Sequence, residues 1–181
     1  MNPKYWEMRY RTGGTSGPGS RGAEAAWKVE LVNRLLAQVG ARSVLDLGSG
    51  DGFLRSLGLA SAFPYLGIEP SATARKIAAG RPARIPSTYL EAIPELERRD
   101  VALSLDVIFH QTTEAAYRGH LADLFGHAER FVIVYGTDYP LRGAPHVLHR
   151  NWTPDIPEGW AIAEQHGHNK FKTAWLLERM R

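Results

Sequence analysis

A glycine-rich turn is the feature that most limits what this chain can fold into. The run Ser43-Val44-Leu45-Asp46-Leu47 is predicted as a short buried strand, and glycines then alternate through Gly48-Ser49-Gly50-Asp51-Gly52. Because glycine has no side chain, such a turn lets the backbone bend tightly and approach a ligand closely. A helix is expected over Leu54–Ala60, which places the turn between a strand and a helix. We therefore expect a ligand beyond the carboxyl end of the strand.

The rest of the chain alternates apolar runs with helical patterns. Further strands are expected at residues 65–69, 100–105, 131–135, 160–165 and 173–179. Helices are expected at Ala23–Val39, Ala72–Ala79 and Glu114–Phe125. The proline-containing stretches 81–94 and 139–159 are predicted as a short strand with turns and as mostly loop. This alternation predicts an α/β fold with a mostly parallel sheet between two helix layers, and the closing hairpin adds one antiparallel strand.

An acidic residue, Glu69, ends the second predicted strand. Its two carboxylate oxygens can accept hydrogen bonds from both hydroxyls of a ribose. A dinucleotide turn usually has a third glycine three residues after the second, where this chain has Phe53. Asp46 and Asp51 add negative charge, which repels a pyrophosphate and suits the ammonium and sulfonium groups of S-adenosylmethionine. The turn therefore favours S-adenosylmethionine over a nicotinamide dinucleotide.

The composition argues against several classes of binding partner. With 181 residues, 44% of them hydrophobic, the chain is large enough for one domain with its own core. No apolar run approaches the ~20 residues of a membrane helix and no secretion signal is present, so we expect a cytoplasmic protein without a membrane partner. The formal charge is only +3 and the basic residues are scattered, which argues against a nucleic-acid partner. Cysteine is absent, which excludes disulfides and thiolate metal sites.

The first 22 residues are predicted as a segment separate from the domain at 23–181. Aromatic and charged residues run through Tyr10, and Gly13–Ser20 then contains four glycines and a proline. Such a stretch cannot be the interior of a helix or strand. It is either a flexible linker or a mobile lid whose backbone amides approach the ligand, and composition alone favours the linker.

The combined motifs resemble the class I (Rossmann-like) S-adenosylmethionine-dependent methyltransferases, in a small bacterial single-domain branch. Val44–Leu54 is similar to the first family motif, Leu66–Ser71 to the second and Asp100–His110 to the fourth. Tyr5-Trp6-Glu7-x-Arg9-Tyr10, followed by the glycine-rich stretch, is similar to the start of that branch, which favours a lid over a linker. The resemblance implies a three-layer sandwich whose seven-stranded sheet has the order 3-2-1-4-5-7-6, with strand 7 antiparallel.

The resemblance also implies where S-adenosylmethionine binds. Gly48 and Gly50 would pack against its methionine and ribose, and Glu69 would hold the ribose hydroxyls. The full set of expected cofactor-binding residues is Asp46, Gly48, Ser49, Gly50, Gly52, Phe53, Glu69, Pro70, Leu105 and Asp106. Many family members also have an Asp near the end of the third strand for the adenine amine. No Asp occurs between residues 81 and 99, and the candidates that remain are Ser87, Thr88, Tyr89 and Glu91.

The residues expected to act on a substrate follow the fourth and fifth strands. His110 is either a general base that takes a hydroxyl proton or a residue that lines the pocket without proton transfer. His146 and His149 are further catalytic candidates, and the spacing of the three histidines matches no zinc signature, so no metal is expected. The expected substrate-binding residues are Tyr135, Arg150 and Trp152. Side chains of these types suit an anionic or sugar-like molecule.

We therefore predict an enzyme that methylates a small molecule, on oxygen, as a monomer or homodimer. Two alternatives remain open, namely a methyltransferase for RNA or protein and a non-catalytic S-adenosylmethionine-binding protein. The first would usually carry an added binding domain, an Asn/Asp-Pro-Pro-Tyr/Phe motif or a dense basic stripe, and this sequence has none of them. The intact turn with Glu69 argues against the second, although it supports binding more firmly than chemistry.

Overall fold

Seven strands form one sheet with the order β3-β2-β1-β4-β5-β9-β8 in the computed structural model, which describes residues 2–180. The strands are β1 Val44–Leu47, β2 Tyr65–Ile68, β3 Ser87–Leu90, β4 Arg99–Leu105, β5 Ala128–Gly136, β8 Trp160–Gly167 and β9 Thr173–Arg179. The first five pair in parallel, whereas β9 runs antiparallel to both β5 and β8. Within this sheet β8 is sixth and β9 seventh in chain order, so the predicted order 3-2-1-4-5-7-6 is confirmed.

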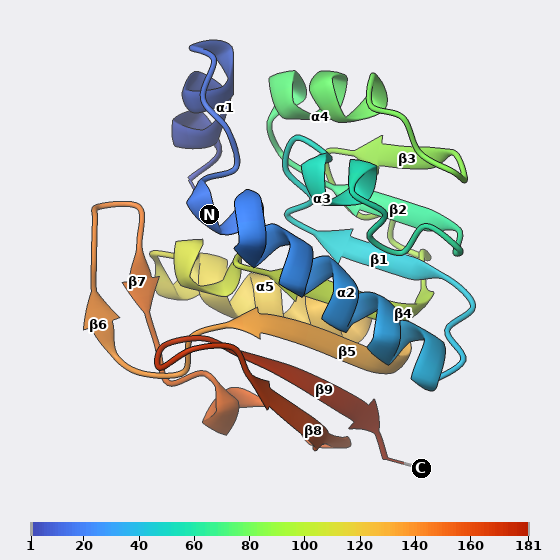
Figure 1. Cartoon of the computed structure of the whole chain (residues 1–181). Helices are drawn as coiled ribbons and strands as arrows, with labels where there is room; N and C mark the ends of the chain where they lie inside the picture. The colour runs from blue at the N-terminus through green and yellow to red at the C-terminus, as the bar shows by residue number, and fades with distance from the viewer. Residues whose placement is uncertain (1, 181) are drawn as a thin grey trace.

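Helices cover both faces of the sheet. Helix α2 (Gly22–Gln38) lies across one face and α5 (Glu114–Gly126) lies behind the other, as Figure 1 shows. Alternate residues of a strand point to opposite faces. In β1, Val44 accordingly packs in the cluster that contains α2, while Leu45 and Leu47 pack in the cluster that contains α5. Both clusters are apolar, which explains why the central strands read as continuous hydrophobic runs.

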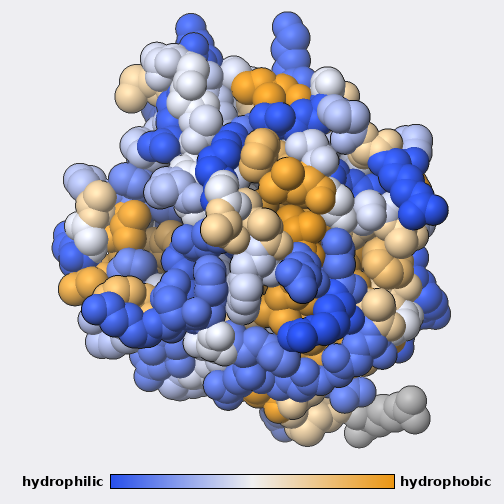
Figure 2. Space-filling view, viewed as in Figure 1, coloured by the Kyte–Doolittle hydropathy of each residue, from blue (hydrophilic) through white to orange (hydrophobic). Residues whose placement is uncertain are grey.

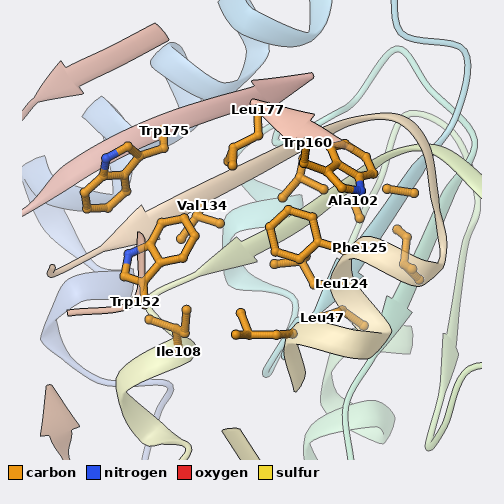
Figure 3. Packing of buried hydrophobic residues seen from close by; sticks show 14 of the residues in the cluster. Leu47, Ala102, Ile108, Leu124, Phe125, Val134, Trp152, Trp160, Trp175 and Leu177 are labelled. Carbon is orange, nitrogen blue, oxygen red and sulfur yellow. The ribbon is translucent and has the colours of Figure 1, made fainter. Parts of the chain in front are cut away.

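Three tryptophans close the core on the α5 side. Trp152, Trp160 and Trp175 gather there with Phe125 and Leu177, as Figure 3 shows. The rings of Trp152 and Trp175 meet edge to face, with centroids 5.2 Å apart. The antiparallel strands β8 and β9 therefore share the main core and extend the sheet.

Several elements match the expected ones closely. Helix α4 (Ala72–Ala79) has the predicted bounds, and its cap Ser71 accepts a hydrogen bond from the Ala74 amide at 3.0 Å. The helix expected over Leu54–Ala60 is reduced to α3 (Phe53–Ser56). It ends early because Gly58 and Ala60 both adopt positive φ, which a right-handed helix cannot contain.

Two segments have more structure than the sequence suggested. Residues Pro3–Arg11 form helix α1, which lies beside α4 in Figure 1. The expected loop at 139–159 contains a small ribbon of β6 (Leu141–Arg142) and β7 (Leu148–His149). Met1 and Arg181, the ends of the two predicted segments, lie outside the described residues, and the division at residue 22 stays a prediction.

The surface facing the viewer is mostly hydrophilic, with hydrophobic atoms visible near its centre, as Figure 2 shows. Among residues 2–180, no helix combines the length and the apolar character that crossing a membrane requires. The predicted cytoplasmic location and oligomeric state stay predictions.

Candidate active site

The glycine turn after β1 is built as its sequence predicts. Gly48, Gly50 and Gly52 have φ values of +80°, +60° and +69°, a region that side-chain-bearing residues rarely adopt. A Cβ at Gly48 would lie 2.6 Å from a methyl group of Val107, and one at Gly50 would lie 2.5 Å from the Ser16 hydroxyl. Glycine is therefore required both by the backbone conformation and by the close approach of neighbouring segments.

Glu69 follows the last residue of β2 and contacts this turn. Its carboxylate is buried and accepts hydrogen bonds from the backbone amides of Ser71 (2.8 Å) and Gly50 (3.2 Å). Burial raises its pKa to about 7, against the opposing effect of those two amides. A carboxylate has about four acceptor sites. Two bonds to the protein therefore leave acceptors for the hydroxyls of a ligand.

The N-terminal stretch folds over the turn. The hydroxyls of Tyr10 and Ser16 are 2.9 Å apart, and Ser16 donates to Asp51 within the turn at 2.9 Å. Ser16 and Ser20 both line the cavity at the turn. These contacts place residues 13–20 at the turn cavity, and we call this stretch the lid from here on, although its closure over a ligand stays a prediction.

Asp51 is the point at which the lid is fastened. Its carboxylate accepts a hydrogen bond from Arg21 at 2.6 Å and a second from Arg81 at 3.2 Å. Burial alone would raise the pKa of Asp51, but its bonds to Arg21 and Ser16 hold the value below the ordinary one. The guanidinium groups of Arg21 and Arg81 also lie over the Phe53 ring, with centroid distances of 3.9 and 5.3 Å.

Helix α1 is fastened to the domain separately. Glu7 accepts hydrogen bonds from the hydroxyls of Ser71 (2.7 Å) and Thr73 (2.6 Å), at the start of α4. The bonds from Thr73 and Ser71 lower the pKa of Glu7 to about 2. Trp6 and Tyr10, one helical turn apart on α1, are buried against Ala74 of α4. The lid therefore connects helix α1, which is anchored to α4, with Arg21, which is anchored to Asp51.

Two adjoining cavities open at the carboxyl ends of β1, β2 and β4. The first, the turn cavity, has a volume of about 40 Å³ and is lined by Glu69 and two of the turn glycines. The second, the histidine cavity, has a volume of about 350 Å³ and is lined by all three candidate histidines. The residues that line both are Trp6, Ser16, Ser20, Asp106 and His110. Ligands bound in the two cavities would therefore lie next to each other, beside these shared side chains.

His110 has a defined protonation state at this junction. Its Nδ1 lies 2.9 Å from the carbonyl oxygen of His146. A carbonyl can only accept, so Nδ1 carries the proton and Nε2 is left with its lone pair. Burial lowers the pKa of His110 to about 4, which keeps the ring neutral at physiological pH. His110 can therefore accept a proton or a hydrogen bond at Nε2.

Asp106 belongs to a partly buried group of charges. Its carboxylate pairs with Lys28, which is fully buried, and with Lys172 at 2.9 Å. Lys172 also pairs with Glu24 at 2.5 Å, and Lys28 donates to the Gly19 carbonyl of the lid at 2.8 Å. Asp106 has a positive φ of 60°, which is uncommon for a residue with a side chain. These pairs hold the strained residue in the wall between the cavities.

Other predicted cofactor residues have more varied positions. Leu105 lines the turn cavity. Asp46 is buried and accepts a hydrogen bond from the Tyr65 hydroxyl at 2.5 Å, and burial raises its pKa to about 6. The turn cavity is not lined by the remaining predicted cofactor residues, which are Asp46, Ser49, Gly52, Phe53 and Pro70.

The predicted substrate residues lie apart from the histidine cavity and need correction. Trp152 is fully buried in the core because its ring packs against Trp175. Tyr135 is also fully buried, and its hydroxyl bonds to Glu24 and His168. Arg150 pairs with Glu114 at 3.2 Å, at a separate surface pocket. None of these three side chains is found in the wall of either cavity.

The three candidate histidines line one cavity, and their catalytic roles stay predictions. His146 and His149 line the histidine cavity together with His110, and the rings of His146 and His110 stack with centroids 5.6 Å apart. Within residues 2–180, no three His, Cys, Asp or Glu side chains are grouped so that they could hold a metal ion.

Sequence reasoning missed several residues of the site. Trp6, Arg9 and Lys172 line the histidine cavity, and Val107 packs against Gly48. The helical spacing of Trp6 and Tyr10 could have indicated an amphipathic helix near the site. No local pattern marks Lys172, which reaches the cavity because β9 pairs with β5.

The sheet order and the helices on both faces form a Rossmann-like α/β fold, as the sequence predicted, and this fold occurs in solved structures of methyltransferases. The chain is similar to the N-methyltransferase NodS from Bradyrhizobium japonicum WM9 in complex with S-adenosyl-L-homocysteine (TM-score 0.79, 13% identity, 100% of both chains). It is also similar to magnesium protoporphyrin IX methyltransferase (ChlM) from Synechocystis PCC 6803 with bound SAH (TM-score 0.69, 20% identity, 98% of this chain and 97% of that one).

Sequence comparison also finds a methyltransferase and a carboxymethyltransferase. The chain is 29% identical over 163 residues to a ubiquinone biosynthesis O-methyltransferase from Rhodopseudomonas palustris (strain HaA2). The match covers 80% of this chain and 63% of that protein, so the chain spans about three fifths of that relative's length. It is 30% identical over 107 residues to a tRNA U34 carboxymethyltransferase from Shewanella sp. (strain W3-18-1), covering 54% of this chain and 32% of that protein. No protein-family model matches the chain.

Proposed function

We propose that this protein is an S-adenosylmethionine-dependent methyltransferase that transfers the methyl group to an oxygen of a small molecule. The observation that carries the proposal is the pair of adjoining cavities with His110 and Asp106 in their shared wall. One cavity suits the methyl donor and the other the acceptor. The two ligands would meet at the junction, as a direct displacement requires.

The residues that line the turn cavity suit the methyl donor. Gly48 and Gly50 bring backbone without side chains to its wall, and Glu69 supplies a buried carboxylate there. That carboxylate would accept the ribose hydroxyls, and its negative charge would favour a positively charged cofactor. When bound, S-adenosylmethionine would supply an electrophilic methyl group on its sulfonium.

His110 would receive the proton of the acceptor hydroxyl. Its Nε2 is unprotonated, because Nδ1–H is held by the His146 carbonyl. With a pKa of about 4, His110 is a weak base toward a free hydroxyl. An oxygen that gains a methyl group becomes far more acidic, however, so a weak base suffices once the new bond begins to form. The alternative, in which His110 only lines the pocket, stays open to test.

The lid would exclude water from the reaction. Ser16 and Ser20 of the lid and Trp6 of α1 line both cavities, so closure covers the junction. The cavities lie within the same domain that supplies the sheet. These features support a small acceptor rather than an RNA or protein substrate.

Titration calorimetry with S-adenosylmethionine, S-adenosylhomocysteine and NAD tests the proposal. We expect both sulfur nucleosides to bind and NAD to bind at least tenfold more weakly, as a site with Glu69 and two further acids near the turn would repel a pyrophosphate (about 1.4 kcal/mol per tenfold). Glu69→Gln should weaken both sulfur nucleosides by about tenfold, because an amide replaces one acceptor oxygen with a donor.

The matched control is Glu95→Gln, an exposed carboxylate away from both cavities. It should leave every affinity unchanged. Tight binding of NAD with no response to the sulfur nucleosides would overturn the proposal. Equal binding by the wild type and Glu69→Gln would remove Glu69 from the ribose role.

A further inference from the structure

The histidine cavity has one cation that no acid in its wall neutralises. Among residues 2–180, the only acidic side chain in that wall is Asp106, and the full cations are Arg9 and Lys172. Asp106 already pairs with Lys172 and Lys28, and Lys172 pairs with Glu24. Two lysines and two acids thus balance one another. Arg9 is left as the cation available to a ligand.

Arg9 is held in place by neutral groups. Its Nε donates to the Thr15 carbonyl of the lid at 2.6 Å, and its Nη1 donates to the Tyr5 hydroxyl at 3.2 Å. Within residues 2–180 it forms no ion pair at salt-bridge distance, and its side chain is half-buried. A guanidinium has five N–H groups. Arg9 therefore keeps donors for an anion while its position is fixed, which is the arrangement that recognises a carboxylate.

Aromatic rings form much of the remaining wall. Trp6, Phe109, His146 and His149 all line the cavity. The rings of Phe109 and His149 lie 5.1 Å apart, and His146 stacks on Tyr5 at 4.5 Å. Flat aromatic walls favour a flat ligand, since rings attract one another in stacked and edge-to-face arrangements.

We propose that the methyl acceptor is a small planar acid, a flat ring that carries both a carboxylate and the hydroxyl to be methylated. The carboxylate binds Arg9, the ring lies against Trp6 and Phe109, and the hydroxyl faces His110 at the junction. This inference rests on the proposed function and names the class of substrate for that site. Because Arg9 also holds Thr15, a bound carboxylate stabilises the closed lid.

The test compares two probes that share a shape and differ in charge, 3-hydroxybenzoate and 3-hydroxybenzamide. Each is titrated into the full chain after saturation with S-adenosylhomocysteine. The acid should bind at least about tenfold more tightly than the amide, because it alone forms a charge-assisted bond with Arg9. Arg9→Gln should abolish this preference. Arg11→Gln, an exposed arginine on the same helix, should keep it.

The outcomes separate this inference from the proposed function. Failure of S-adenosylhomocysteine to bind the wild type counts against the proposed function itself. If it binds but the acid and the amide bind equally, or neither binds at millimolar concentration, the planar-acid inference is overturned. A preference that survives in Arg9→Gln overturns it as well. Loosening of the lid in that variant would show as weaker nucleoside binding, and the ratio of acid to amide would still decide.

Discussion

His110 and Glu69 both lie in the wall of the turn cavity, and burial shifts their pKa values in opposite directions. The pKa of His110 falls to about 4 and that of Glu69 rises to about 7. In both cases the fold favours the uncharged form, as removal from water always does. A positively charged ligand beside Glu69 would restore the carboxylate form. Binding of such a ligand would therefore release protons near pH 7.

We predict that His110 stays neutral, with its proton on Nδ1, from about pH 5 to pH 8. The measurement is NMR of the imidazole nitrogens of His110 during a pH titration, with His110→Asn to assign the signal. The expected midpoint is about 4. A midpoint near the ordinary value of 6.5, or a proton on Nε2, would contradict the proposed role of Nε2 as acceptor.

The lowered pKa of His110 also determines the direction in which the stability of the folded chain changes with pH. The unfolded chain binds a proton at His110 below about pH 6.5, whereas the folded chain does so only near pH 4. Stability should therefore fall as the pH drops from 6.5 toward 4, and level off below that window. His120, half-buried beside Ser104, has its pKa lowered by burial to about 4 and contributes in the same window.

At the scale of elements, the N-terminal stretch acts on the site only if it stays closed. Asp51 fastens the lid through Ser16 and Arg21. We predict that Asp51→Asn weakens S-adenosylhomocysteine binding by about tenfold, because a neutral amide forms weaker bonds to both groups. Deletion of residues 1–20 should weaken it at least as much. Titration calorimetry of both proteins makes the measurement.

A double-mutant cycle separates the lid from other effects of Asp51. If Asp51 acts by holding the lid, Asp51→Asn should add little once residues 1–20 are gone. Glu95→Gln in the full chain is the control for a change of charge alone. Unchanged binding after the deletion would restore the interpretation of this stretch as a linker.

Much of this element structure could be predicted from local sequence. Helix α4 follows from Ser71 as a cap, and the glycine turn follows from its alternating glycines, because each depends on residues close in the chain. Helix α1 was missed, although Trp6 and Tyr10 have helical spacing, because a short aromatic and charged run gives a weak pattern. The sequence predicts too long a helix after the turn, because a single glycine such as Gly58 is a weak signal for the end of a helix.

At the scale of the whole molecule, the sheet order determines which distant segments meet. Parallel strands β2, β1 and β4 end on the same edge, which brings Glu69, the glycine turn and His110 together. This convergence could be predicted, since ligands bind at the carboxyl ends of such strands.

The pairings that complete the site could not be predicted from the sequence. Lys28 of α2 pairs with Asp106 after β4, and Lys172 pairs with the same carboxylate from the turn before β9. Contacts between residues so far apart in the chain produce no local sequence pattern. Trp152 is a wrong prediction of a different kind. A tryptophan next to polar residues suggested a ligand contact, but its ring packs in the core.

The most direct test of the central claim is a crystal structure of the protein with S-adenosylhomocysteine. The account predicts that the ribose hydroxyls lie within hydrogen-bond distance of Glu69, with the sulfur at the junction and directed toward His110 and the histidine cavity. The lid should cover the nucleoside through Ser16. A nucleoside bound elsewhere, or a sulfur that faces away from the histidine cavity, would contradict the account.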